Sequence, residues 1–123
     1  MKIFSTNTCV VPQDLTTITN TAQEVDAEQG GMSNIQVEKI WQSIEQLYRT
    51  GNYPLISLCL RRQGKIIINR SLGYAQGSSA NGLSADARIA NTETPICLFS
   101  ASKMITAMLV HMLNEMGEIN LLD

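Results

Sequence analysis

Ser100 and Lys103 are the residues whose types and spacing most clearly suggest chemistry. They form a Ser-x-x-Lys pattern at the start of a long apolar run that ends at Met116. Residues three apart lie on one face of a helix, so the hydroxyl and the amine should point the same way. A lysine amine that burial and neighbouring groups keep neutral can take the serine proton. The pattern therefore predicts a nucleophilic serine at a helix N-terminus, where free N–H groups and the helix dipole favour negative charge.

Two nearby side chains are rivals for these roles, and helix geometry argues against both. His111, the one histidine of the chain, lies about 16 Å along the axis from Ser100, whereas a general base must come within about 3 Å. We expect it to be a hydrogen-bonded packing residue. Ser102 lies about 200° around the helix from Ser100, away from the face of Lys103. One structural alternative stays open, with Ser100 as an N-cap and Lys103 as a solvated side chain.

The residues after Lys103 predict a helix that is buried on several sides. From Met104 to Met116, apolar residues go nearly all the way round a helical wheel. A lysine at the start of such a helix is costly to bury unless it has a partner or a task. Gly117 should end this helix.

An amphipathic helix is predicted between Ser33 and Gly51. Ser33 and Gln36 fit a capping box, and Gly51 fits the residue that follows a helix. Trp41 and Tyr48 lie on the apolar stripe at helical spacing, which is typical of core residues rather than of a ligand platform. We expect this helix to cover a sheet.

A β-hairpin is predicted from residues 55–62 and 65–74, joined by a turn at Gln63-Gly64. Cys59 lies in the first strand and should be a small buried hydrophobic residue. The predicted hairpin carries four basic side chains at its tip and edge, which should be solvated: Arg61, Arg62, Lys65 and Arg70. Anion binding by this cluster is the alternative.

Two further segments are predicted to lack regular structure. Residues 75–94 form a long connection that contains Gly77-Ser78-Ser79-Ala80-Asn81-Gly82, so we expect a surface loop at the rim of the site. Gly77-x-Ser79-x-Asn81 is not a nucleophile elbow, because it misses the Gly-x-Ser-x-Gly pattern by its last residue. Residues 1–33 are polar and rich in Thr, Gln and Asn, so we expect a flexible leader before a domain at 34–123.

Several of these motifs together resemble the serine β-lactamase-related family, and most closely class C β-lactamases and the esterases built on the same fold. The resemblance covers roughly residues 34 to 123. The segments that carry it are Gly51–Leu58, Gln63–Ile67, Leu72–Ala75, Pro95–Val110 and Gly117–Asp123. It implies an α+β domain of the β-lactamase/transpeptidase-like fold, in which a helix, an antiparallel hairpin and a buried active-site helix form the N-terminal part.

The resemblance also implies a reaction and assigns roles in it. Ser100 matches the serine that is acylated by an ester or β-lactam, and Lys103 matches the adjacent lysine. Whether that lysine or another group is the acylation base is disputed for these enzymes. The Ser100 N–H would supply half of the oxyanion hole. No metal or organic cofactor is implied.

Two later motifs of the family, Tyr-x-Asn and Lys/His-Thr-Gly, have no match in the chain. We therefore expect an N-terminal portion whose partner is the missing C-terminal part of the same domain. Two alternatives to a complete hydrolase follow: a penicillin-binding or acyl-binding protein without turnover, and a non-catalytic fragment whose exposed helix docks on another chain.

Composition and charge limit the partners, metal sites and cellular settings that remain to be considered. The chain has 123 residues and a net charge of −2, which suits one small domain and favours neither nucleic acid nor a membrane surface as a partner. Three widely spaced cysteines show no metal-binding spacing. Residues 5–8 interrupt any apolar core of a signal peptide, so we expect a reduced, cytoplasmic setting and prefer an esterase to a periplasmic β-lactamase.

Overall fold

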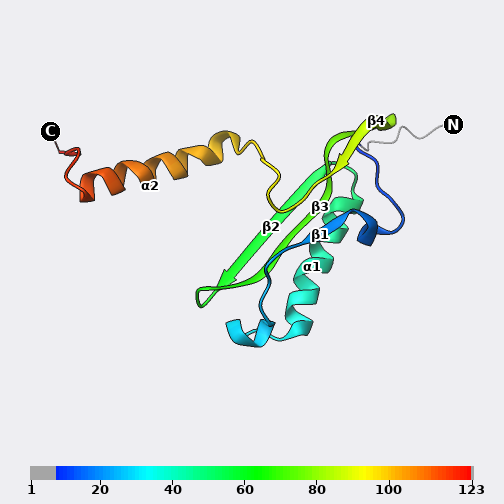
Figure 1. Ribbon diagram of the computed structural model, residues 1–123, viewed down its shortest axis with the longest axis horizontal. Helices are drawn as coiled ribbons and strands as arrows, with labels where there is room; N and C mark the ends of the chain where they lie inside the picture. The colour runs from blue at the N-terminus through cyan, green and yellow to red at the C-terminus, as the bar shows by residue number, and fades with distance from the viewer. Residues whose placement is uncertain (1–7, 123) are drawn as a thin grey trace.

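The computed structural model describes residues 8–122, which form an α+β arrangement of a helix against an antiparallel sheet, followed by a second helix that extends away from it (Figure 1). Within this range the sheet has four strands, and β3 pairs with each of the other three. In chain order the elements are the 3₁₀ turn η1 (Leu15–Ile18), strand β1 (Thr19–Thr21), the 3₁₀ turn η2 (Ala27–Gly30), helix α1 (Asn34–Arg49), strands β2 (Leu55–Arg62), β3 (Lys65–Ser79) and β4 (Gly82–Ile89), the 3₁₀ turn η3 (Phe99–Ala101) and helix α2 (Ser102–Glu115).

Helix α1 begins and ends where the sequence predicts. The Ser33 hydroxyl accepts from the Gln36 N–H, and the Gln36 side chain accepts from the Ser33 N–H, which completes the capping box. Gly51 follows the helix in the left-handed region. Trp41 and Tyr48 are buried, so their interpretation as core residues is confirmed.

The hairpin of β2 and β3 is also confirmed. Its turn residues Gln63 and Gly64 both have positive φ, which matches the right-handed twist of the flanking strands. Cys59, however, is exposed, so the prediction of a buried cysteine is wrong. The core lies on the other face of β2, where alternate side chains pack against it. Those side chains are Ile56, Leu58 and Leu60.

The predicted surface loop at residues 75–94 is wrong for much of its length. Strand β3 continues to Ser79, and β4 returns beside it, with Ser79 opposite Gly82. After β4 the chain is anchored at the fully buried Ala90, whose N–H donates to Gly73 and whose carbonyl accepts from the Ser71 hydroxyl. These bonds fix the point from which the chain leads toward η3.

The N-terminal segment differs from the flexible leader that we expected. Residues 8–33 pack on the sheet, with Leu15 and Ile18 buried in the core and β1 paired to β3, Thr19 opposite Leu72. Val11, Val25 and Met32 of the same segment are partly buried and pack against this core. Residues 1–7 lie outside the described residues.

An ion pair holds the same segment to β3. Arg70, which we expected to be solvated, donates from Nε to Glu24 at 2.8 Å and from Nη2 at 2.9 Å. Its guanidinium lies over the Trp41 ring, 5.2 Å from the centroid. The Asn69 N–H donates to the same carboxylate at 2.9 Å. Burial raises the pKa of Glu24, but the bonds from Arg70 and Asn69 and the charge of Arg70 outweigh it and lower that pKa.

Candidate functional site

The Ser-x-x-Lys pair lies where the chain enters helix α2. Ser100 is the middle residue of η3, and Lys103 is in the first turn of α2. Lys103 Nζ donates to Ser100 Oγ at 3.4 Å, which is a long hydrogen bond. The two side chains therefore lie on one face, as their spacing predicts.

Ser100 is not a helix cap. Leu98 caps η3 and Ala101 caps α2, and neither makes a capping bond through its side chain. The alternative of an N-cap at Ser100 is therefore wrong, whereas its other part, a solvated Lys103, matches the exposed side chain. Just before it, Phe99 has φ of 46°, a left-handed conformation that is uncommon for a bulky residue. Its side chain is exposed.

The pair is open to solvent, and so is the helix behind it. Ser100 and Lys103 are exposed, and α2 contains no buried residue. The prediction of a buried active-site helix is not met among the described residues, because α2 leads away from the sheet instead of packing on it (Figure 1). Its large apolar side chains are therefore left uncovered in the range 8–122: Met104, Ile105, Met108, Leu109, Met112 and Leu113.

Ser102 and His111, the two rivals for the catalytic roles, both lie in α2. The Ser102 carbonyl accepts from the Thr106 hydroxyl at 3.1 Å, within the helix. His111 is exposed, so its interpretation as a packing residue is wrong. No hydrogen bond between His111 and Ser100 occurs in the part of the chain that the structure describes.

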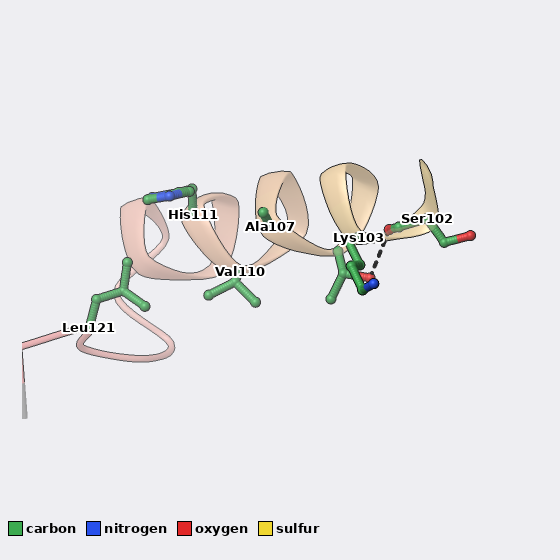
Figure 2. Close-up of a pocket in the computed structure, with 7 residues that line it drawn as sticks. Ser102, Lys103, Ala107, Val110, His111 and Leu121 are labelled. Atoms are coloured by element: carbon green, nitrogen blue, oxygen red, sulfur yellow. Dashed lines mark hydrogen bonds between the residues drawn. The ribbon is translucent and has the colours of Figure 1, made fainter. Parts of the chain in front are cut away.

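A shallow groove lies along α2 (Figure 2). On the helix it is lined by Ser102, Lys103, Thr106, Ala107, Val110 and His111. Leu121, from the segment after the helix, also lines it, and sequence reasoning missed this residue. The Leu121-Leu122 pair just after Gly117 was the available signal, since a chain that turns back at a glycine can cover the last turns of its helix.

A second hollow lies beside the end of β4 and is lined partly by Arg88, Asn91 and Glu93.

Across residues 8–122, no three His, Cys, Asp or Glu side chains are grouped so that they could hold a metal ion. None of the described helices is long and apolar enough to cross a membrane.

A serine and a lysine three residues apart at the entry to a helix form the first of the sequence motifs of β-lactamases and penicillin-binding proteins. A family model described as Beta-lactamase matches residues 40–123, which is more than half of the chain. The chain belongs to the beta-lactamase family. No curated protein and no solved structure matches it.

Family membership confirms the resemblance found in the sequence and defines the fold as a partial β-lactamase-like one. It also indicates a hydrolase function of the serine type.

Proposed function

We propose that this protein hydrolyses small esters or β-lactams through an acyl-enzyme, with Ser100 as the nucleophile. The observation that carries the proposal is the hydrogen bond from Lys103 Nζ to Ser100 Oγ, 3.4 Å long, at the entry to α2. It puts a proton acceptor within reach of the hydroxyl once the amine is neutral.

In the first step Ser100 Oγ attacks the carbonyl carbon while its proton passes to Lys103 Nζ. The C–O bond to the leaving alcohol, or the lactam C–N bond, then breaks, and the leaving group takes that proton. Water next attacks the acyl carbon and gives one of its protons to Lys103 Nζ. The bond between the acyl carbon and Ser100 Oγ then breaks, which releases a carboxylic acid, and Ser100 Oγ takes the proton from Lys103 Nζ. The Ser100 N–H is proposed as one donor to the oxyanion.

An ester is the preferred substrate within this proposal. An alkoxide leaves with less help from a general acid than an amine does, and among residues 8–122 Lys103 is the one basic side chain hydrogen-bonded to Ser100 Oγ. An exposed site with one such group suits the easier of the two reactions.

Acylation without turnover is the second candidate. Deacylation needs a base that activates water beside the acyl group, and in the part of the chain that the structure describes the side chain hydrogen-bonded to Ser100 Oγ is that of Lys103 alone. This candidate differs from the first in one measurable way, the number of turnovers per molecule of protein.

The test is to treat the purified protein with a fluorophosphonate probe and locate the adduct by mass spectrometry. We expect the adduct on Ser100, its loss in Ser100→Ala, and its retention in the matched variant Ser102→Ala. Ester hydrolysis should continue past one equivalent of product, whereas a burst that stops at one equivalent would favour the second candidate. An unlabelled Ser100 in folded protein would refute both.

A further inference from the structure

The turn at the tip of the β3–β4 hairpin carries a reactive pair of residues. Ala80 and Asn81 connect the two strands, and Gly82 follows them, opposite Ser79. Asn81-Gly82 is the one Asn-Gly pair of the sequence. The side-chain amide carbon of an asparagine can be reached by the backbone nitrogen of the next residue, and a glycine there has no side chain to hinder the approach. The pair therefore holds both atoms of an intramolecular substitution.

The structure leaves the two partners of that reaction accessible. Asn81 is exposed, and among the described residues no atom beyond the chain neighbours of Gly82 lies within 4 Å of the place where its Cβ would be. Within residues 8–122 the Asn81 side-chain amide makes no hydrogen bond, whereas the side-chain oxygens of Asn91 and Asn114 each accept one from a backbone N–H. The amide group of Asn81 is therefore free to rotate toward Gly82.

The Ser79 hydroxyl holds the turn together without blocking this approach. It accepts from the Asn81 N–H at 3.3 Å and donates to the Gly82 carbonyl at 3.2 Å. Neither bond uses the Asn81 side chain or the Gly82 nitrogen. The turn lies far from α2 (Figure 1), and exposed residues flank it on both strands, so it should open readily.

We propose that Asn81 is a site of spontaneous deamidation in the folded protein, through a cyclic imide formed with Gly82. The Gly82 nitrogen loses its proton to solvent and attacks Asn81 Cγ. The bond from Cγ to the side-chain nitrogen then breaks, and that nitrogen takes up a proton and leaves as ammonia. A water molecule next adds its hydroxyl to one ring carbonyl, and its other proton goes to the Gly82 nitrogen as the ring opens.

The ring opens in two ways, which give different chains. Breaking the bond between the Gly82 nitrogen and Cγ leaves an ordinary aspartate at position 81. Breaking the bond between that nitrogen and the backbone carbonyl carbon leaves an isoaspartate, in which the chain runs through Cβ and Cγ. The isoaspartate adds a backbone carbon to a two-residue turn, so Ser79 and Gly82 cannot keep their register. Either product also adds a negative charge.

The other hairpin of the same molecule supplies a matched control. Its turn, Gln63-Gly64, is also exposed, and Gly64 also has positive φ with open space around it. The Gln63 side chain is one carbon longer than that of an asparagine, so attack by the Gly64 nitrogen must close a larger ring from a less favourable geometry. A difference between the two turns therefore reports ring closure and not exposure.

The test incubates the protein at pH 8 and follows one tryptic peptide by liquid chromatography and mass spectrometry. Trypsin cleaves after Arg70 and Arg88, and the peptide between them has Asn81 as its one asparagine. We expect both products to appear there, at least about tenfold faster than deamidation of Gln63 or of Asn91, whose following nitrogen is hindered by the branched Thr92. Equal rates at Asn81 and Asn91 would overturn the proposal.

Two further measurements assign the reaction to Asn81 and to the folded state. Asn81→Gln should remove both products from the peptide and leave the fluorescence of Trp41 unchanged, so products that persist in this variant would contradict the assignment. In urea only the local sequence acts, and the rate in the folded protein should lie within about tenfold of that in urea, because the turn opens readily. A folded rate further below it would show that the turn protects Asn81, which would overturn the proposal.

Discussion

Replacing Glu24 by alanine should destabilise the fold by about 2 kcal/mol. Glu24 accepts three hydrogen bonds, two from Arg70 and one from the Asn69 N–H. At about 1 kcal/mol net for each, their loss amounts to about 3 kcal/mol. The side chains of Glu24 and Arg70 are each 17% exposed, so new hydrogen bonds to water compensate for part of the lost free energy. A change of about 2 kcal/mol corresponds to a fall in Tm of about 8 °C for a domain of this size.

Urea unfolding followed by the fluorescence of Trp41 is the appropriate assay. Trp41 is the only tryptophan of the chain, and it is buried beneath the Arg70 guanidinium. Glu28→Ala is the matched control, since it removes an exposed carboxylate from the same N-terminal segment. Equal unfolding midpoints for the two variants would show that the Glu24 pair does not hold the segment to the sheet.

The Glu24–Arg70 ion pair should also make the free energy of unfolding depend on pH, so that the fold becomes less stable in acid. The pKa of Glu24 in the folded chain lies below its ordinary value of 4.5. Its contribution is therefore complete above about pH 5 and is lost as the pH falls through the lowered pKa. Glu24→Ala should remove this part of the acid sensitivity, and an unchanged acid profile in that variant would contradict the assignment.

Three further outcomes are expected. Gly73→Ala should cost about 3 kcal/mol in urea unfolding, because φ is 114° and a Cβ would collide with the Pro54 carbonyl; Gly64→Ala, also at positive φ but in open space, should cost about 1 kcal/mol. Ser33→Ala breaks the capping box of α1 and should cost about 1 kcal/mol by the same assay. Cys9 is buried and donates to two backbone carbonyls, and burial raises the pKa of its thiol. Iodoacetamide at pH 8 should therefore modify it at least about tenfold more slowly than the two exposed cysteines, and equal rates in the folded protein would contradict its burial.

The parts of the fold that the sequence predicts are those specified by nearby residues. Helix α1 is marked by Ser33 and Gln36 at its start and by Gly51 after its end. The first hairpin is marked by its two-residue turn. The Ser100–Lys103 contact follows from their spacing on a helical turn, without knowledge of anything else in the structure.

The parts that sequence reasoning missed depend on distant partners. Leu15 and Ile18 are buried because β3 lies beside them, and no local pattern shows this. Arg70 looks like one more basic residue of a hairpin until Glu24 is placed against it. Strand β4 has glycine and serine where a strand usually has β-branched residues, so its composition does not predict a strand. It forms one because it pairs with β3.

The central position of β3 also sets an order of events in time. Its pairing with β2 closes through a two-residue turn, whereas β1 must bring Thr19 beside Leu72, which lies 53 positions further along the chain. Short loops close first and long ones last, so the hairpin should form early and the N-terminal segment should dock late. The amides of β1 should then exchange with solvent through partial opening, ahead of those shared by β2 and β3.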